Sequence, residues 1–147
     1  MTQPSPGTTK ATMGGDAEES RLAKLFEQIP ALLAADPDLR RRGSWFDARF
    51  QIGVGSISFD LNVQGGSIAS LERGPLLMRS WQFAIRGTAE AWRRHWQPVP
   101  EAGWHDLFAL SKRGVLRMEG DLWPLVANLQ YVKDLVALPR RIASEVK

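Results

Sequence analysis

The chain has 147 residues, 44% of them hydrophobic, and its six Trp and six Phe supply large side chains for the core of about one domain. It contains no Cys, which excludes disulfides, thiolate metal sites and cysteine nucleophiles and fits a reducing compartment. The formal net charge is only +3, and no base-reading nucleic-acid module is recognisable. The longest apolar run, residues 29–35, is far shorter than the roughly 20 residues of a membrane-spanning helix.

The N-terminal region divides into a polar leader and an amphipathic helix. Residues 1–16 are rich in Thr, Gly and Pro and lack the apolar core of a signal peptide, so we expect a disordered leader and a cytoplasmic location. Residues 17–34 are predicted to be helical, with Pro30 kinking or interrupting the helix. A short helical turn is expected at residues 37–42, before the break at Gly43. The apolar positions at helical spacing are Leu22, Leu25, Phe26, Ile29 and Leu33.

Alternation of apolar and polar residues predicts five strands, each with one buried and one wet face. Gly65 and Gly66 are typical of a hairpin turn between the second and third strands. Asp60 and Glu119 are predicted on the wet face, where solvated arginines of neighbouring strands could pair with them. The five ranges are residues 46–54, 57–63, 67–72, 81–87 and 114–120.

Three further helices are expected around the fourth and fifth strands. Thr88 is typical of the cap of the first helix, which Pro98 and Pro100 would end. A second short helix is predicted at residues 104–110, and Asp121 is expected to cap the last one. We interpret this last helix as a roof over the sheet, because its apolar side chains form one continuous stripe. The stripe consists of Leu122, Leu125, Val126, Leu129, Val132 and Val136.

This order predicts an α+β fold, with a five-stranded, mostly antiparallel sheet and amphipathic helices packed on one face. The helical crossover before the fifth strand indicates a parallel pairing with one neighbour. We expect the leader at residues 1–16, one domain at 17–140 and a tail at 141–147. Such layers can enclose an apolar cavity. Core packing alone would produce the same apolar stripe, so the residues leave a filled and a hollow interior open.

The last strand and the helix after it resemble the sterol carrier protein 2-like family. The segment Arg113-Gly114-Val115-Leu116-Arg117-Met118-Glu119-Gly120-Asp121 is similar to that family's approach to its last helix. The strand at residues 81–87 and the following Thr88-Ala89-Glu90-Ala91-Trp92 add a second cue. The resemblance spans residues 20–138 and departs from the family in an insertion at residues 97–106.

The resemblance implies a fold that encloses a tunnel for a sterol, a fatty acyl chain or a similar molecule. It therefore implies a non-catalytic protein, without a cofactor, that binds or transfers a lipid-like ligand. Large apolar side chains from several layers are expected to line the tunnel. These residues are Phe50, Phe59, Phe83, Trp92, Trp96, Phe108, Leu122, Leu125, Val126 and Leu129.

A second resemblance leads to an alternative function. Residues 104–110 and the later Asp121-Leu122-Trp123-Pro124 look like a bacterial branch of the same family that is associated with α/β-hydrolase domains. This implies an accessory module that docks on a partner enzyme or presents substrate to it. Docking would use residues 98–108, with Trp104 as an anchor.

Small basic clusters are open to three interpretations: solvated surface charge, contact with lipid headgroups and contact with nucleic acid. Interspersed carboxylates favour the first, so at most peripheral membrane contact and no nucleic-acid partner are expected. The clusters are Arg40-Arg41-Arg42, Arg93-Arg94, Lys112-Arg113 and Arg140-Arg141.

A catalytic function would have to use His105 and Asp106, together with Ser80 or Ser111. Adjacent residues seldom converge on one reacting atom, and no Gly-x-Ser-x-Gly elbow is present to expose a nucleophile. His105 and His95 are therefore interpreted as structural, and no catalytic residue or metal site is predicted.

Overall fold

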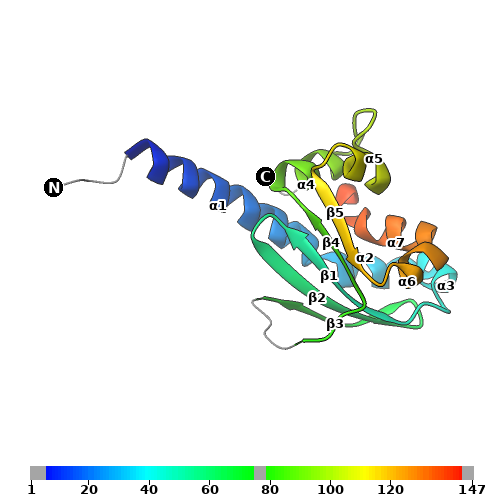
Figure 1. Cartoon of the computed structure of the whole chain (residues 1–147). Helices are drawn as coiled ribbons and strands as arrows, with labels where there is room; N and C mark the ends of the chain where they lie inside the picture. The colour runs from blue at the N-terminus through cyan, green and yellow to red at the C-terminus, as the bar shows by residue number, and fades with distance from the viewer. Residues whose placement is uncertain (1–5, 75–78, 144–147) are drawn as a thin grey trace.

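A computed structural model of the chain describes residues 6–74 and 79–143. One five-stranded sheet has the strand order β3-β2-β1-β4-β5, and the helices gather on one side of it (Figure 1). None of the helices in the described ranges is long and apolar enough to span a bilayer. The strands are β1 (Ala48–Val54), β2 (Ile57–Gln64), β3 (Ser67–Arg73), β4 (Phe83–Gly87) and β5 (Leu116–Gly120). The helices are α1 (Pro6–Phe26), α2 (Ile29–Ala34), α3 (Pro37–Arg42), α4 (Ala89–His95), α5 (Leu107–Lys112), α6 (Trp123–Ala127), α7 (Leu129–Val136) and the 3₁₀ helix η1 (Leu138–Arg141).

The α+β architecture with a mostly antiparallel sheet is confirmed, and the strands lie where the alternation of residues predicted them. The hairpin turn between β2 and β3 is confirmed at Gly65 and Gly66, which have φ angles of 58° and 79°. Glycine reaches this region at no steric cost, so the turn can be tight.

The parallel pair of the sheet lies between β1 and β4, and β5 runs antiparallel to β4. The parallel pairing expected for β5 is therefore wrong. The pairing is antiparallel because the chain leaves β4 at Gly87 and returns through α4 and α5 to the same end of that strand. Leu116 therefore pairs with Gly87. A parallel pairing of β5 with β4 would have required the chain to cross over to the opposite end of β4.

The first helix is longer than predicted, because α1 begins at Pro6 and its first turns project from the body of the domain (Figure 1). Residues 6–16, which we placed in a disordered leader, are thus helical. Extending a helix that is already packed over residues 17–26 costs less than nucleating one, which explains the extension. The interruption expected at Pro30 is confirmed, since α2 begins at Ile29. The domain boundaries at residues 16 and 140 stay predictions, and residues 144–147 of the predicted tail lie outside the described residues.

The predicted roof helix is broken at Asn128 into α6 and α7. Asn128 leaves the helical conformation, with φ −127° and ψ 37°, and its side-chain amide donates to the Pro124 carbonyl oxygen at 3.1 Å. That bond satisfies a carbonyl at the end of α6 that would otherwise need the next helical turn. The continuous stripe from Leu122 to Val136 is therefore wrong, because the break changes the direction in which α6 presents its side chains.

The wet face of the sheet carries the predicted ladder of charges. Arg86 pairs with Glu119, and Arg49 lies 3.9 Å from Asp60. Asp60 itself is buried, which corrects the expectation of a solvated carboxylate. Burial raises the pKa of Asp60, while Arg49 and Arg79 act in the opposite direction. The other face packs against the helices and forms the core.

Candidate hydrophobic binding site

Six of the predicted lining residues are fully buried in the core between the sheet and the helices. Phe50 and Phe83 stack across the parallel pair β1–β4, with ring centroids 4.7 Å apart. Trp92 and Trp96 stack along α4 at 5.1 Å. The structure therefore brings these side chains together as predicted, and whether they line a ligand site stays a prediction. The six residues are Phe50, Phe59, Phe83, Trp92, Trp96 and Leu125.

Phe26 of α1 joins two parts of this core, and we did not predict it as a lining residue. Its ring lies 4.7 Å from that of Phe59 and 6.1 Å from that of Trp96. Phe46 likewise lies between Phe50 and Tyr131, at 6.2 and 5.3 Å. The helical stripe of residues 17–34 was the signal that pointed to Phe26, whereas Tyr131 carried no such signal.

The two buried tryptophans of α4 also satisfy their polar atoms. Trp92 donates its indole N–H to the Gly53 carbonyl oxygen of β1, and Trp96 donates to the Val136 carbonyl oxygen of α7, both at 2.8 Å. A buried indole N–H without an acceptor would be costly, so these bonds fix the positions of both rings. α4 is thereby attached to the sheet on one side and to the roof on the other.

The remaining four predicted residues are not fully buried, although Leu122 packs against the edge of the core. The side chain of Val126 is 52% exposed and that of Phe108 is 36% exposed, while Leu122 and Leu129 are half-buried. The interior position expected for Val126 and Phe108 is therefore wrong. For Val126 the reason is the helix break described above, which buries only Leu125 of α6.

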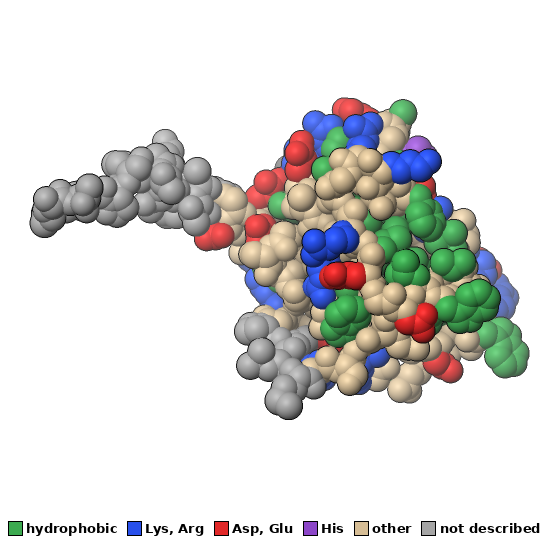
Figure 2. Space-filling model, in the orientation of Figure 1, with side chains coloured by type: hydrophobic (Ala, Val, Ile, Leu, Met, Phe, Trp, Pro, Cys, Tyr) green, Lys and Arg blue, Asp and Glu red, His purple; other side chains and the backbone are tan. Residues whose placement is uncertain are grey.

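These side chains instead contribute to an apolar surface around α6. Figure 2 shows hydrophobic side chains gathering on this side of the molecule, over α6 and beside it. We define the α6 surface as Leu122, Trp123, Val126 and Leu129, of which Trp123 is 72% exposed. Phe108 of α5 lies beside α7, where the Lys133 Nζ is 5.1 Å from the centre of its ring. Exposed apolar groups of this extent commonly mark binding regions.

Five pockets formed by described residues open at the surface, and they are distributed around the domain. Trp96 is the one predicted lining residue that borders any of these five, and it does so in a pocket of about 210 Å³ beside α1. The aromatic side chains of the core contact one another, as the ring distances above show.

The residues considered for catalysis are held in other interactions. His105 is exposed, and the Asp106 carboxylate lies 2.7 Å from Lys133. Burial alone would raise the pKa of Asp106, but Lys133, the Ala109 amide and His105 together lower it below its ordinary value. In residues 6–74 and 79–143 no three His, Asp or Glu side chains are placed to hold a metal ion.

Trp104, the expected docking anchor, is buried rather than exposed. The guanidinium groups of Arg94 and Arg113 lie 4.3 and 4.7 Å from the centre of its ring, which is a cation–π arrangement. Its carbonyl oxygen accepts a hydrogen bond from the Nδ1 of buried His95 at 2.9 Å. The anchor role of Trp104 is therefore wrong, and the residue stabilises the insertion at residues 97–106.

No family model and no curated protein matches the sequence. Several solved structures match the fold. Sterol carrier protein 2 aligns with a TM-score of 0.62 and 15% identity, over 80% of this chain and 94% of that one. A conserved hypothetical protein of Thermus thermophilus, described as a possible sterol carrier protein, aligns at 0.56 and 12%, over 79% and 86% of the two chains.

A third similar structure is the UbiJ-SCP2 ubiquinone synthesis protein, with a TM-score of 0.53 and 16% identity, over 81% of this chain and 90% of that one. At these identities the likeness is one of fold. The chain has a sterol carrier protein 2-like fold, as the residues of its last strand and helix predicted.

Proposed function

We propose that this chain binds a lipid-like hydrophobic molecule, such as a sterol or a fatty acyl compound, and does not catalyse a reaction on it. The observation that carries the proposal is an apolar connection from the α6 surface to the aromatic core. Trp123 and Val126 are exposed, and Leu125 between them is fully buried and belongs to the same core cluster as Phe50 and Phe83. The shared fold with sterol carrier protein 2 supports the same ligand class.

The properties of α6 support entry of a ligand at this place. It has five residues, and Leu125 is the one of them that is buried. A helix this short is stabilised by its tertiary contacts rather than by its own hydrogen bonds. Because Leu125 is the one side chain of α6 that is buried, outward movement of α6 would open the core next to an apolar entrance while removing few buried contacts.

Burial of an apolar ligand supplies the binding energy. Each methylene contributes about 0.8 kcal/mol, so ten methylenes provide about 8 kcal/mol before entropic losses, which is near the micromolar range. Few polar groups lie among the core side chains, and those of Trp92 and Trp96 already have partners. Affinity should therefore follow the length and shape of the ligand.

A charge on the α6 surface should weaken binding. In Val126→Asp we expect at least about a tenfold loss of affinity for a fluorescent fatty acid, because a carboxylate at an apolar entrance would have to be desolvated. Val99→Asp is the matched control, since Val99 is an exposed valine outside α6. Displacement titrations of both folded variants measure the effect. Equal affinities would contradict the proposed entrance.

As a second candidate function, we propose that the chain is an accessory module that docks on a partner enzyme such as an α/β-hydrolase. Exposure of Trp45 and Trp123 favours it, since large exposed aromatics commonly anchor interfaces. The similar structure described as a ubiquinone synthesis protein agrees with such a setting. A partner that is lost on Val126→Asp while fatty acid affinity is unchanged would favour docking over ligand binding.

A further inference from the structure

A pocket of about 540 Å³ lies where α3 meets α7 and η1, away from the α6 surface. Three guanidiniums border it, those of Arg42, Arg140 and Arg141, together with the Asp134 carboxylate. Pro98 and Leu138 are among its apolar lining residues. We call it the arginine pocket. Its volume is within the range of small-molecule sites.

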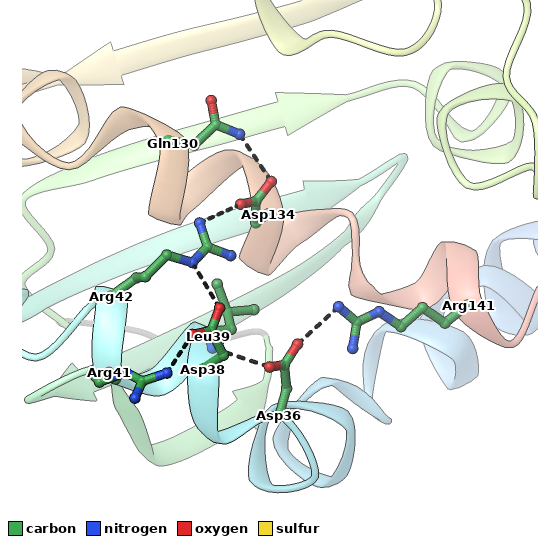
Figure 3. Close-up of polar contacts among 8 residues, drawn as sticks. All are labelled: Asp36, Asp38, Leu39, Arg41, Arg42, Gln130, Asp134 and Arg141. Atoms are coloured by element: carbon green, nitrogen blue, oxygen red, sulfur yellow. Dashed lines mark hydrogen bonds and ion pairs between the residues drawn. The ribbon is translucent and has the colours of Figure 1, made fainter.

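Two of the three arginines are paired with carboxylates. The Arg42 Nη1 donates to Asp134 at 2.8 Å, and the Arg141 Nη2 donates to Asp36 at 2.8 Å. Figure 3 shows these two pairs on opposite sides of the contact between α3 and α7–η1. Both arginines are substantially exposed, so they can change partners at little cost.

Arg140 differs from its two neighbours. Its Nε donates to the His95 carbonyl oxygen at 3.0 Å, which is a neutral acceptor. Its Nη2 is buried and has no hydrogen-bond partner among the described residues, and no carboxylate within those residues forms an ion pair with it. Burial lowers the pKa of Arg140, which shows that the surroundings disfavour its charge.

A buried cationic donor without an acceptor is energetically costly. An anion in the pocket would remove that cost if the Arg140 side chain, which lines the pocket, turned its Nη2 toward it. Phosphate oxygens accept paired hydrogen bonds from the planar guanidinium fork. Asp134 and Asp38 face Arg42, and Asp36 pairs with Arg141, so among the described residues Arg140 is the cation of this lining that no paired carboxylate balances. A phosphate group can accept from its unpaired donor and, by replacing an exposed pair, from Arg42 or Arg141 as well.

We propose that the arginine pocket binds a phosphate group, with Arg140 as its central donor. The phosphate can belong to a small soluble compound or to a lipid headgroup, since the recognising chemistry is the same. The site does not depend on the apolar entrance at α6, so it can be tested separately from the proposed function.

Calorimetric titration with inorganic phosphate at constant ionic strength tests the proposal. Arg140→Gln should weaken binding by about tenfold, because it removes a charge-assisted donor. Arg141→Gln should also weaken phosphate binding. Because Arg141 is exposed, this variant should fold normally and can replace Arg140→Gln if the latter does not fold. Arg117→Gln on β5 removes the same charge outside the pocket and should have no effect.

Asp134→Asn distinguishes phosphate binding from a purely structural role of the pocket arginines. It removes the carboxylate that lines the pocket and frees the Arg42 Nη1, while Asp38 stays beside the Arg42 Nε, so phosphate should bind several-fold more tightly. Absence of phosphate binding in the wild type, or equal affinity in wild type and Arg140→Gln, would overturn the proposal.

Vesicles distinguish the two sources of phosphate. One set of phosphatidylcholine vesicles contains phosphatidate, a phosphomonoester. The other contains phosphatidylglycerol, a phosphodiester, in an amount that gives the same surface charge. Arg140-dependent binding to phosphatidate assigns the pocket to a lipid headgroup. Arg140-dependent binding of inorganic phosphate without vesicle binding assigns it to a soluble phosphate compound. Vesicle binding that is equal in the wild type and Arg140→Gln, and depends on surface charge alone, would count against the site.

Discussion

The Gly66→Ala variant is expected to lose more than about 2 kcal/mol of unfolding free energy. Gly66 has φ 79°, and a Cβ there would lie 2.4 Å from the Arg40 carbonyl oxygen and 2.7 Å from the Gly43 carbonyl carbon. Both are backbone atoms, which cannot rotate away as a side chain would. The substitution therefore combines left-handed backbone strain with a steric clash.

Gly65→Ala is the matched control for this prediction. Gly65 has φ 58°, and the nearest atom to its added Cβ would be the Ser44 carbonyl oxygen at 3.8 Å. Only the backbone strain remains there, so a loss of about 1 kcal/mol is expected. Urea unfolding of both variants measures the difference. Losses of the same size would show that the contact of Gly66 with the α3 end has no energetic weight.

The turn at Gly66 matters because it holds the roof of the candidate site. The Tyr131 hydroxyl of α7 donates to the Gly66 carbonyl oxygen at 2.8 Å. Burial raises the pKa of Tyr131 from the ordinary 10.0 to about 12, so this donor stays protonated even in mildly alkaline solution. A shift of Gly66 would therefore displace α7 relative to the sheet, and we expect ligand affinity to fall together with stability in Gly66→Ala.

His95 is expected to make the protein less stable in mild acid. Burial lowers its pKa from the ordinary 6.5 to about 4, and Arg140 also disfavours its charge. The unfolded chain therefore takes up a proton in this interval that the folded chain does not. Stability is complete above pH 6.5 and is lost as the pH falls toward 4. The total loss is about 3 kcal/mol, from a shift of roughly two and a half pH units.

His95→Asn should remove this pH dependence. The amide nitrogen of Asn can occupy the position of Nδ1 and still donate to the Trp104 carbonyl oxygen, but it does not titrate. Thermal melting at about pH 7 and about pH 4.5 provides the measurement, with His105→Asn as the control at an exposed histidine. The wild type and His105→Asn should both lose stability between these values. A similar loss in His95→Asn would assign the effect to other groups.

The sequence predicted the strands well because apolar side chains that face the helices alternate with polar ones on the opposite face, even where those polar residues are buried. Phe59 and Leu61 are buried against the helices, whereas Asp60 between them belongs to the charged ladder on the opposite face. The cap at Thr88 was equally local, because its hydroxyl accepts from the Ala91 amide, as expected. Asp121 lies one residue before the N-cap of α6, which is Leu122, and its carboxylate accepts from the Trp123 amide at 3.1 Å. Such features depend on neighbours in the sequence, and so the pattern of residues contains them.

The sequence did not predict features that depend on distant partners. Val126 fits an apolar helical stripe, but the helix ends at Asn128, whose side chain bonds to the Pro124 carbonyl oxygen, and Val126 lies at the surface. Trp104 would be a good anchor if Arg94 and Arg113 did not enclose it. The arginine pocket likewise joins residues from α3, the loop after α4 and the C-terminal helices, and no local pattern brings these segments together.

Native mass spectrometry of the freshly purified protein is the sharpest test of ligand binding. We expect a bound apolar compound on the wild type and on Val99→Asp, and its loss or marked reduction on Val126→Asp. Fatty acid or sterol added to the stripped wild type should restore the bound mass. A folded wild type that carries no apolar compound, and takes up none of the added ligands, would contradict the proposed function.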